Sequence, residues 1–140
     1  MTFPTRALLP FLCAVFSSPA LAQSDQCFTG DFDTFLARFS TEIAVQQAST
    51  ADPLLLDFLD LRVKPDPQLL GDEVPPSEVH WPVMPDSATL ADHGLVMEVS
   101  DANETAKSVL VDNKDSGVRV TWFFASDPCW TLIRMLHETM

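Results

Sequence analysis

One stretch between residues 31 and 48 constrains the fold of this chain most, because its apolar residues recur with the period of an α-helix. Successive members lie three, one, three and four residues apart, which places them on one face of a helix. They are Phe32, Phe35, Leu36, Phe39 and Ile43. Each buried side chain of this size stabilises a fold by about 1.5–3 kcal/mol, and an isolated helix cannot bury them. The helix must therefore pack on a sheet or on other helices.

The residues around this helix fit its predicted ends. Thr29 or Asp31 can cap the N-terminus, and Asp33 suits the positive end of the helix dipole. Pro53 predicts a break after the helical region.

Beyond Pro53 the pattern becomes that of strands. Residues 54–63 are mostly apolar with two aspartates among them, a pattern that favours a strand and has a helix as its alternative. Residues 64–93 contain six prolines, so we expect only short regular pieces there, around residues 79–84. Residues 95–99 are predicted to form another strand.

A hairpin is predicted next. Residues 107–111 and 118–124 have strand character and flank the turn sequence Asn-Lys-Asp-Ser-Gly at 113–117. In the second arm alternate side chains share one face: Val118, Val120, Trp122 and Phe124.

The last predicted strand runs from Cys129 to His137, after a turn at Asp127-Pro128. Alternation places Trp130, Leu132 and Leu136 on one side and Ile133 and Met135 on the other. We expect Ile133, like the apolar residues of the helix, in the core. A helix followed by antiparallel strands predicts a single α+β domain over residues 23–140.

The first 22 residues are typical of a signal peptide. Arg6 precedes an apolar run over residues 7–16, and Ala20-Leu21-Ala22 has the form of a cleavage site. The run is shorter than the roughly 20 residues of a membrane span. We therefore expect an exported protein, periplasmic or secreted, that begins at Gln23.

Removal of that leader would leave two cysteines, Cys27 and Cys129, near opposite ends of the domain. In an exported protein a disulfide is favoured, and it would close a loop of about 100 residues. Two free thiols or a metal-binding pair are the alternatives. Two sulfurs do not complete a zinc site, and no histidine pair has ligand spacing, so we predict no metal and no cofactor.

The formal net charge of −12 limits the partners. Such a field repels phosphate groups, so we expect neither nucleic-acid binding nor electrostatic attachment to anionic membranes.

Two blocks of the sequence resemble a bacterial family of exported proteins of unknown function. The first block lies in the helical region and opens the first strand; it comprises Phe35-Leu36, Phe39-Ser40-Thr41-Glu42, Gln46 and Pro53-Leu54. The second lies at the end of the chain; it comprises Val120-Thr121-Trp122-Phe123-Phe124 and Pro128-Cys129-Trp130-Thr131-Leu132. That family is similar in fold to the nuclear transport factor 2-like superfamily. The resemblance implies N-terminal helices packed on a curved antiparallel sheet, as in nuclear transport factor 2-like and cystatin-like cones.

Enzymes of this superfamily place a carboxylate, or a histidine with an aspartate, inside the cone. The resemblance makes Asp57, Asp60 and His137 the weak catalytic candidates. A carboxylate in an apolar pocket has a raised pKa and suits general base catalysis. The simpler interpretation is that each of these side chains alternates to the solvent side of its strand.

Four other residues are weak candidates for ligand contact: His80, Trp81, Trp122 and Trp130. The alternative is that His80 and Trp81 pack a loop on the sheet and that the two strand tryptophans fill the core. Gln46 is expected to hydrogen-bond the backbone of the sheet rather than to act in catalysis.

By fold analogy, the leading hypothesis is a non-enzymatic exported domain that binds a small apolar ligand or a protein partner through the concave sheet face. The alternative is a small dehydratase or isomerase that uses a buried carboxylate in the cone. A homodimer through the sheet face is a third arrangement.

Overall fold

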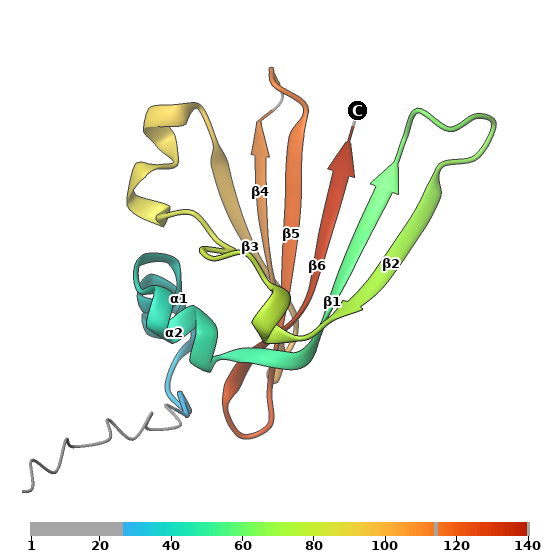
Figure 1. The fold of residues 1–140 in the computed structure, drawn as a ribbon. Helices are drawn as coiled ribbons and strands as arrows, with labels where there is room; N and C mark the ends of the chain where they lie inside the picture. The colour runs from blue at the N-terminus through green and yellow to red at the C-terminus, as the bar shows by residue number, and fades with distance from the viewer. Residues whose placement is uncertain (1–26, 114, 140) are drawn as a thin grey trace, which may run out of the picture.

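The computed structural model describes residues 27–113 and 115–139. They form an α+β fold in which two short helices lie on one side of a six-stranded sheet (Figure 1). The helices are α1 (Phe32–Thr41) and α2 (Ile43–Ala48). The predicted leader, residues 1–22, lies outside the described residues.

Helix α1 begins as the sequence predicts. The Asp31 carboxylate caps it by accepting a hydrogen bond from the Thr34 amide at 2.8 Å. The stripe residues within α1 are all buried; they are Phe32, Phe35, Leu36 and Phe39. The three phenylalanine rings pack on Phe124 of the sheet, and the centroids of Phe39 and Phe124 lie 5.2 Å apart.

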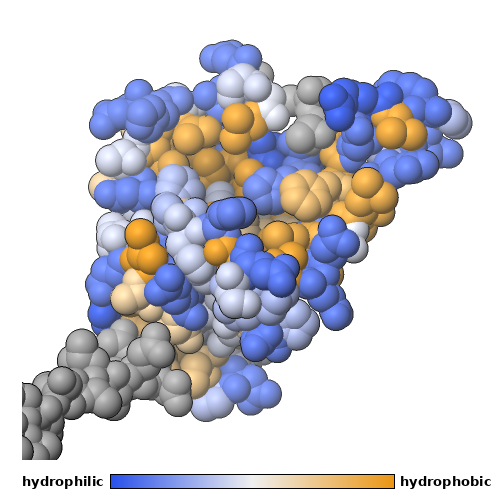
Figure 2. Space-filling model, in the orientation of Figure 1, coloured by the Kyte–Doolittle hydropathy of each residue, from blue (hydrophilic) through white to orange (hydrophobic). Residues whose placement is uncertain are grey.

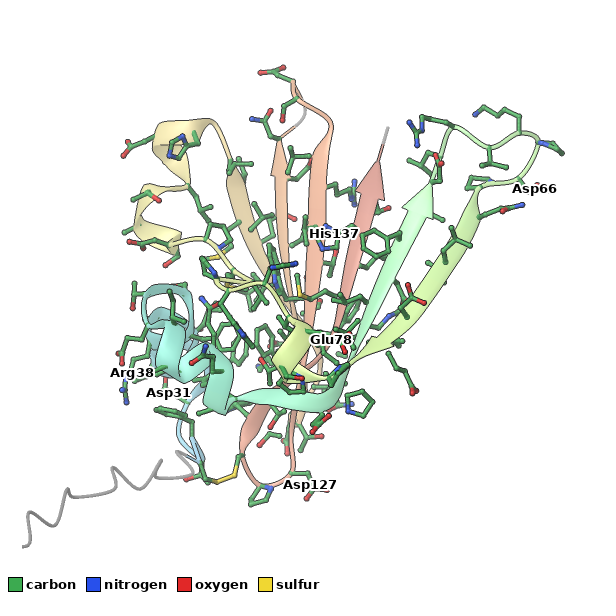
Figure 3. All side chains as sticks on the ribbon, in the orientation of Figure 1. Asp31, Arg38, Asp66, Glu78, Asp127 and His137 are labelled. Carbon is green, nitrogen blue, oxygen red and sulfur yellow. A yellow bond between two sulfur atoms is a disulfide. The ribbon has the colours of Figure 1, made fainter. Side chains whose placement is uncertain are left out.

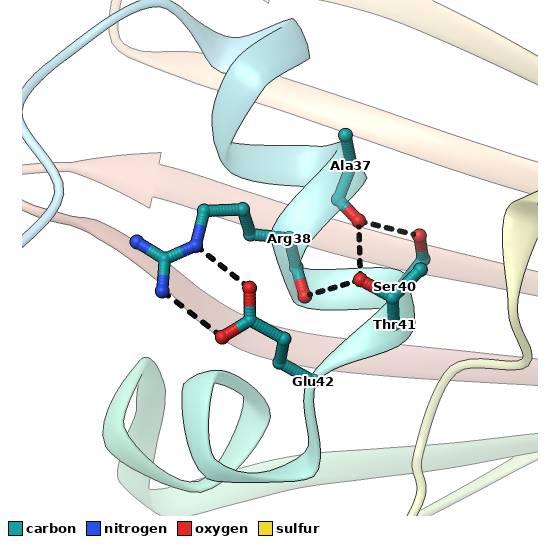
Figure 4. A network of polar contacts seen from close by, with 5 residues as sticks. All are labelled: Ala37, Arg38, Ser40, Thr41 and Glu42. Atoms are coloured by element: carbon teal, nitrogen blue, oxygen red, sulfur yellow. Dashed lines mark hydrogen bonds and ion pairs between the residues drawn. The ribbon is translucent and has the colours of Figure 1, made fainter.

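The helical region predicted over residues 31–48 is interrupted at Glu42, whose backbone is extended. Figure 4 shows the polar contacts at this end: the Arg38 guanidinium pairs with the Glu42 carboxylate at 2.8 Å, and the Ser40 and Thr41 hydroxyls donate to the Ala37 carbonyl. Because α2 restarts in a new direction, Ile43 is exposed. Its predicted place on the buried stripe is wrong.

The sheet has the strand order β2-β1-β6-β5-β4-β3. The strands are β1 (Thr50–Asp60), β2 (Gln68–Val74), β3 (Val96–Asn103), β4 (Ala106–Asn113), β5 (Val118–Ser126) and β6 (Trp130–Thr139). Strands β1 and β6 pair in parallel and the other neighbours pair antiparallel. The predicted hairpin is confirmed as β4–β5, but the wholly antiparallel sheet is wrong.

Two further predictions need correction. The proline-rich segment holds a strand, β2, and it holds three single turns of 3₁₀-helix: η1 (Pro76–Glu78), η2 (Ser87–Thr89) and η3 (Ala91–His93). The short regular pieces predicted around residues 79–84 are absent, because this stretch contains neither helix nor strand. In β6 the register with β5 shifts between Leu132 and Arg134, so Ile133 is an extra residue and is exposed. After this bulge Met135, not Leu136, lies on the buried face.

A disulfide joins Cys27 to Cys129, with Cα atoms 5.0 Å apart, as the sequence favoured. The same two segments also share hydrogen bonds. The Trp130 amide donates to the Phe28 carbonyl at 2.8 Å, and the Trp130 indole donates to the Gly30 carbonyl at 3.0 Å. The segment that precedes α1 is thus fixed to the start of β6.

The two faces of the sheet differ in what covers them. The helix-side face carries Leu54, Trp122 and Phe124, which form the core with α1 and α2. The opposite, open face carries Asp57 and Arg134. In Figure 1 the two helices lie at the level of the lower half of the sheet, so the upper parts of the strands extend beyond them.

Candidate functional site

Strand register places one row of side chains across the whole helix-side face. Residues that are paired between neighbouring strands point to the same side of a sheet, so the pairings define the row. From β2 to β3 it consists of Leu70, Phe58, His137, Val120, Val111 and Met97. We call it the His137 row. It contains five apolar side chains and one titratable group.

The His137 row passes from the core into solvent. Val111 is 2% exposed, whereas Phe58 is 42% and Leu70 is 60% exposed. Figure 2 shows hydrophobic side chains gathered over the upper parts of β3–β5 and again over β1 and β2. The exposed end of the row is therefore continuous with the buried core, and apolar contact area is available there.

His137 lies within this apolar surface. Its imidazole stacks on the Phe58 ring with centroids 5.3 Å apart. Burial lowers the pKa of His137, because a partly desolvated imidazole binds a proton less readily. In Figure 3 the side chain is on the side of the sheet that faces the helices, above Glu78. A neutral imidazole offers a ligand one hydrogen-bond donor and one acceptor.

Asp60 lies on the same face, two residues beyond Phe58 on β1. Its carboxylate accepts hydrogen bonds from the Arg62 side chain at 3.0 Å and from the Arg62 amide at 2.9 Å. These bonds lower the pKa of Asp60. A carboxylate held in this ionised state is a weak general base.

Asp57 points to the open face and does not approach His137. It is only 4% exposed, and the Arg134 side chain donates a hydrogen bond to its carboxylate. Gly71 is its cross-strand neighbour, and a side chain at that position would collide with the carboxylate. The structure therefore separates the aspartate and the histidine that the sequence analysis considered together.

The two strand tryptophans belong to the core. Both are buried, and the Trp122 indole donates to the Val83 carbonyl at 3.0 Å. Trp130 packs on Phe32 with ring centroids 4.9 Å apart. Their hydrogen bonds and packing account for both residues without a ligand.

Gln46 fixes the loop that follows η1. Its buried amide donates to the Met84 carbonyl at 3.0 Å and accepts from the Val83 amide at 2.7 Å. Gln46 therefore bonds this loop and not the backbone of the sheet. His80 is exposed and Trp81 half-buried in the same loop.

Other features of the described residues are weaker candidates. A depression of about 390 Å³ on the open face is lined by Val96, Leu110, Asp112 and Arg119, among others.

Within residues 27–113 and 115–139, no three metal-binding side chains gather at one place. In the same part of the chain, no helix has the length and hydrophobicity to cross a membrane.

Comparison with known proteins supports the fold alone. No protein-family model and no curated protein matches the sequence. The structure is similar to the crystal structure of an NTF2-like protein from Bacteroides fragilis, with a TM-score of 0.58 and 16% sequence identity. The match covers 80% of this chain and 48% of that one, so this chain spans about half the length of its structural neighbour. The nuclear transport factor 2-like fold predicted from the sequence is thereby supported.

His137 was a weak candidate from the sequence, whereas the exposed residues beside it, Phe58 and Leu70, were not candidates. Phe58 follows Leu54 and Leu56 at intervals of two residues, so it shares their face of β1, the helix-side face. No local signal placed Leu70 next to it, because β2 was not predicted.

Proposed function

We propose that this protein is a non-enzymatic binding domain that holds a small apolar ligand at the exposed end of the His137 row. One observation carries the proposal: apolar side chains of the core continue into solvent at Phe58 and Leu70. A ligand that covered them would gain about 25 cal/mol for each Å² of apolar surface removed from water. The nuclear transport factor 2-like fold agrees with this role by analogy only.

We also propose that the protein acts outside the cytoplasm, after cleavage following Ala22. The leader-like sequence and the disulfide between Cys27 and Cys129 support export.

The enzymatic alternative receives less support from the geometry. A dehydratase or isomerase of this fold would need a buried, unpaired carboxylate near the ligand, and Asp72 on the same face is exposed. Asp57 points away and is bound by Arg134, whereas Asp60 is bound by Arg62. An apolar binding surface with one imidazole fits the arrangement better than a buried general base.

The test uses two neighbouring leucines with similar exposure, Leu70 at 60% and Leu69 at 54%. Register places Leu70 on the helix-side face and Leu69 on the open face. Binding of N-phenyl-1-naphthylamine, a neutral apolar dye, would be titrated by fluorescence with the exported protein. Leu70→Ser should weaken binding at least fivefold, and Leu69→Ser should change it less than twofold.

Equal losses in the two variants, or no dye binding by the unmodified protein, would overturn the proposal. Sedimentation at the same concentrations tests whether the protein is a homodimer through this face. If the protein is a dimer that Leu70→Ser dissociates, then a second copy covers this face in place of a small ligand.

A further inference from the structure

We infer that the ligand is a cationic amphiphile: an aromatic or aliphatic body with a protonated amine. This inference rests on the proposed function and adds the chemical class of the ligand. It comes from the charged groups beside the exposed end of the His137 row.

Two carboxylates lie on either side of the Phe58–Leu70 pair. Asp60 follows Phe58 by two residues on β1, and Asp72 follows Leu70 by two residues on β2. Alternate residues of a strand share a face, so all four side chains lie on the helix-side face. Because β1 and β2 run antiparallel, Asp60 and Asp72 lie on opposite sides of the His137 row. An apolar body that lies along the row would have an acid on each side.

The two acids differ in what already binds them. Arg62 neutralises Asp60 at 3.0 Å. Among the described residues no lysine or arginine forms an ion pair with Asp72, which is exposed. Asp72 is therefore the carboxylate that a ligand ammonium group would meet.

The cations of the neighbouring strands are directed elsewhere. Arg134 pairs with Asp57 and Arg119 pairs with Glu138, both on the open face. Lys107 pairs with Asp101 near the other edge of the sheet. Together with the net charge of −12, this arrangement repels an anionic ligand and attracts a cationic one.

The exposed Phe58 ring provides a second attraction. A ligand cation over an aromatic face is stabilised by the ring quadrupole, and 42% of Phe58 is open to solvent. From Leu70 to His137 the row crosses two strand spacings, about 10 Å. A two-ring aromatic body with an aminomethyl group fits that span.

Three naphthalenes that share one body test the inference: 2-(aminomethyl)naphthalene, 2-(hydroxymethyl)naphthalene and 2-naphthoate. They would be titrated into the exported protein at low salt and followed by NMR. We expect the amine to bind at least fivefold more tightly than the alcohol, and the carboxylate to bind most weakly. The NMR chemical shift changes should be largest for Phe58, Leu70 and His137.

Adjacent charge-removing variants provide the matched control, because Asp72 and Glu73 point to opposite faces of β2. Asp72→Asn should weaken amine binding about threefold to fivefold, the range of a partly exposed ion pair, and leave the alcohol unchanged. Glu73→Gln should change amine binding less than 1.5-fold. Unchanged alcohol binding also shows that each variant is folded.

The outcomes separate the two proposals. If the alcohol binds as tightly as the amine, or if both variants weaken the amine equally, the cationic class is wrong and the apolar site stands. If none of the three naphthalenes binds at the His137 row, the proposed function fails as well.

Discussion

Neighbouring residues of β1 show how differently the two faces of the sheet are built. Phe58 points to the face that the helices cover, yet it is 42% exposed. Asp57 points to the face that no helix of the described residues covers, yet it is 4% exposed. Burial in this protein therefore depends on what lies over each position along a strand, and not on the face alone.

The causes are local in both cases. Over Asp57, the Arg134 side chain bonds the carboxylate and lies above the Phe123 ring, with its guanidinium carbon 5.0 Å from the centroid. Gly71 leaves room for the carboxylate on the neighbouring strand. At Phe58, the ring stacks on His137 and lies beside its cross-strand partner Leu70, and no buried core residue among those described closes it off, so 42% of it meets solvent.

The largest expected effect contrasts the covered and uncovered parts of the helix-side face. Phe39→Ala should lower the free energy of unfolding by about 3–5 kcal/mol, because Phe39 is fully buried against Phe124. Phe58→Ala should cost less than about 1 kcal/mol because solvent already reaches the ring. Urea unfolding with the disulfide intact measures both. Similar losses of stability in the two variants would contradict the difference between the covered and uncovered parts of this face.

The next effect concerns the open face. Arg134→Met should lower the free energy of unfolding by about 2–4 kcal/mol, because it leaves the buried Asp57 carboxylate without its partner. Arg119→Met is the control on the same face: its pair with Glu138 is more exposed, so the loss should stay below about 1 kcal/mol. In Arg134→Met, adding Asp57→Asn should recover part of the stability. No recovery would mean that Arg134 acts through its packing on Phe123.

Local patterns in the sequence predicted the parts of the fold that local physics determines. Helical period identified the buried stripe of α1, and turn residues identified the β4–β5 hairpin. Two cysteines in a chain expected to be exported favoured the disulfide. Each of these signals is contained within a short segment or within the cysteine count.

The elements that were missed depend on distant partners. Strand β2 has few β-branched residues and contains Gly71, so it forms through its pairing with β1. Parallel pairing of β1 with β6 leaves no mark in either segment. The extra residue at Ile133 reverses the alternation of β6, which no periodic pattern reveals.

The candidate site was beyond prediction for the same reason. Alternation along a strand can assign Phe58 and His137 each to one face of its own strand. Only the register across three strands brings Leu70, Phe58 and His137 together. The interpretation of Asp57 was half correct. It points to the open face as alternation suggests, and Arg134 keeps it from solvent there.

The smallest expected effect is a titration that reports directly on the exposed end of the row. The pKa of His137 should lie below its usual value near 6.5, because burial disfavours the imidazolium. The unfolded chain then binds the proton more readily, so stability is lost as the pH falls from about 6.5 through the folded pKa, and His137 contributes nothing above that window. NMR titration of the folded and urea-unfolded protein measures both values. Phe58→Ala should raise the folded pKa by admitting water, whereas 2-(hydroxymethyl)naphthalene should lower it by excluding water. A folded pKa at or above the unfolded value would show that His137 is solvated, and the open row would then end at Val120.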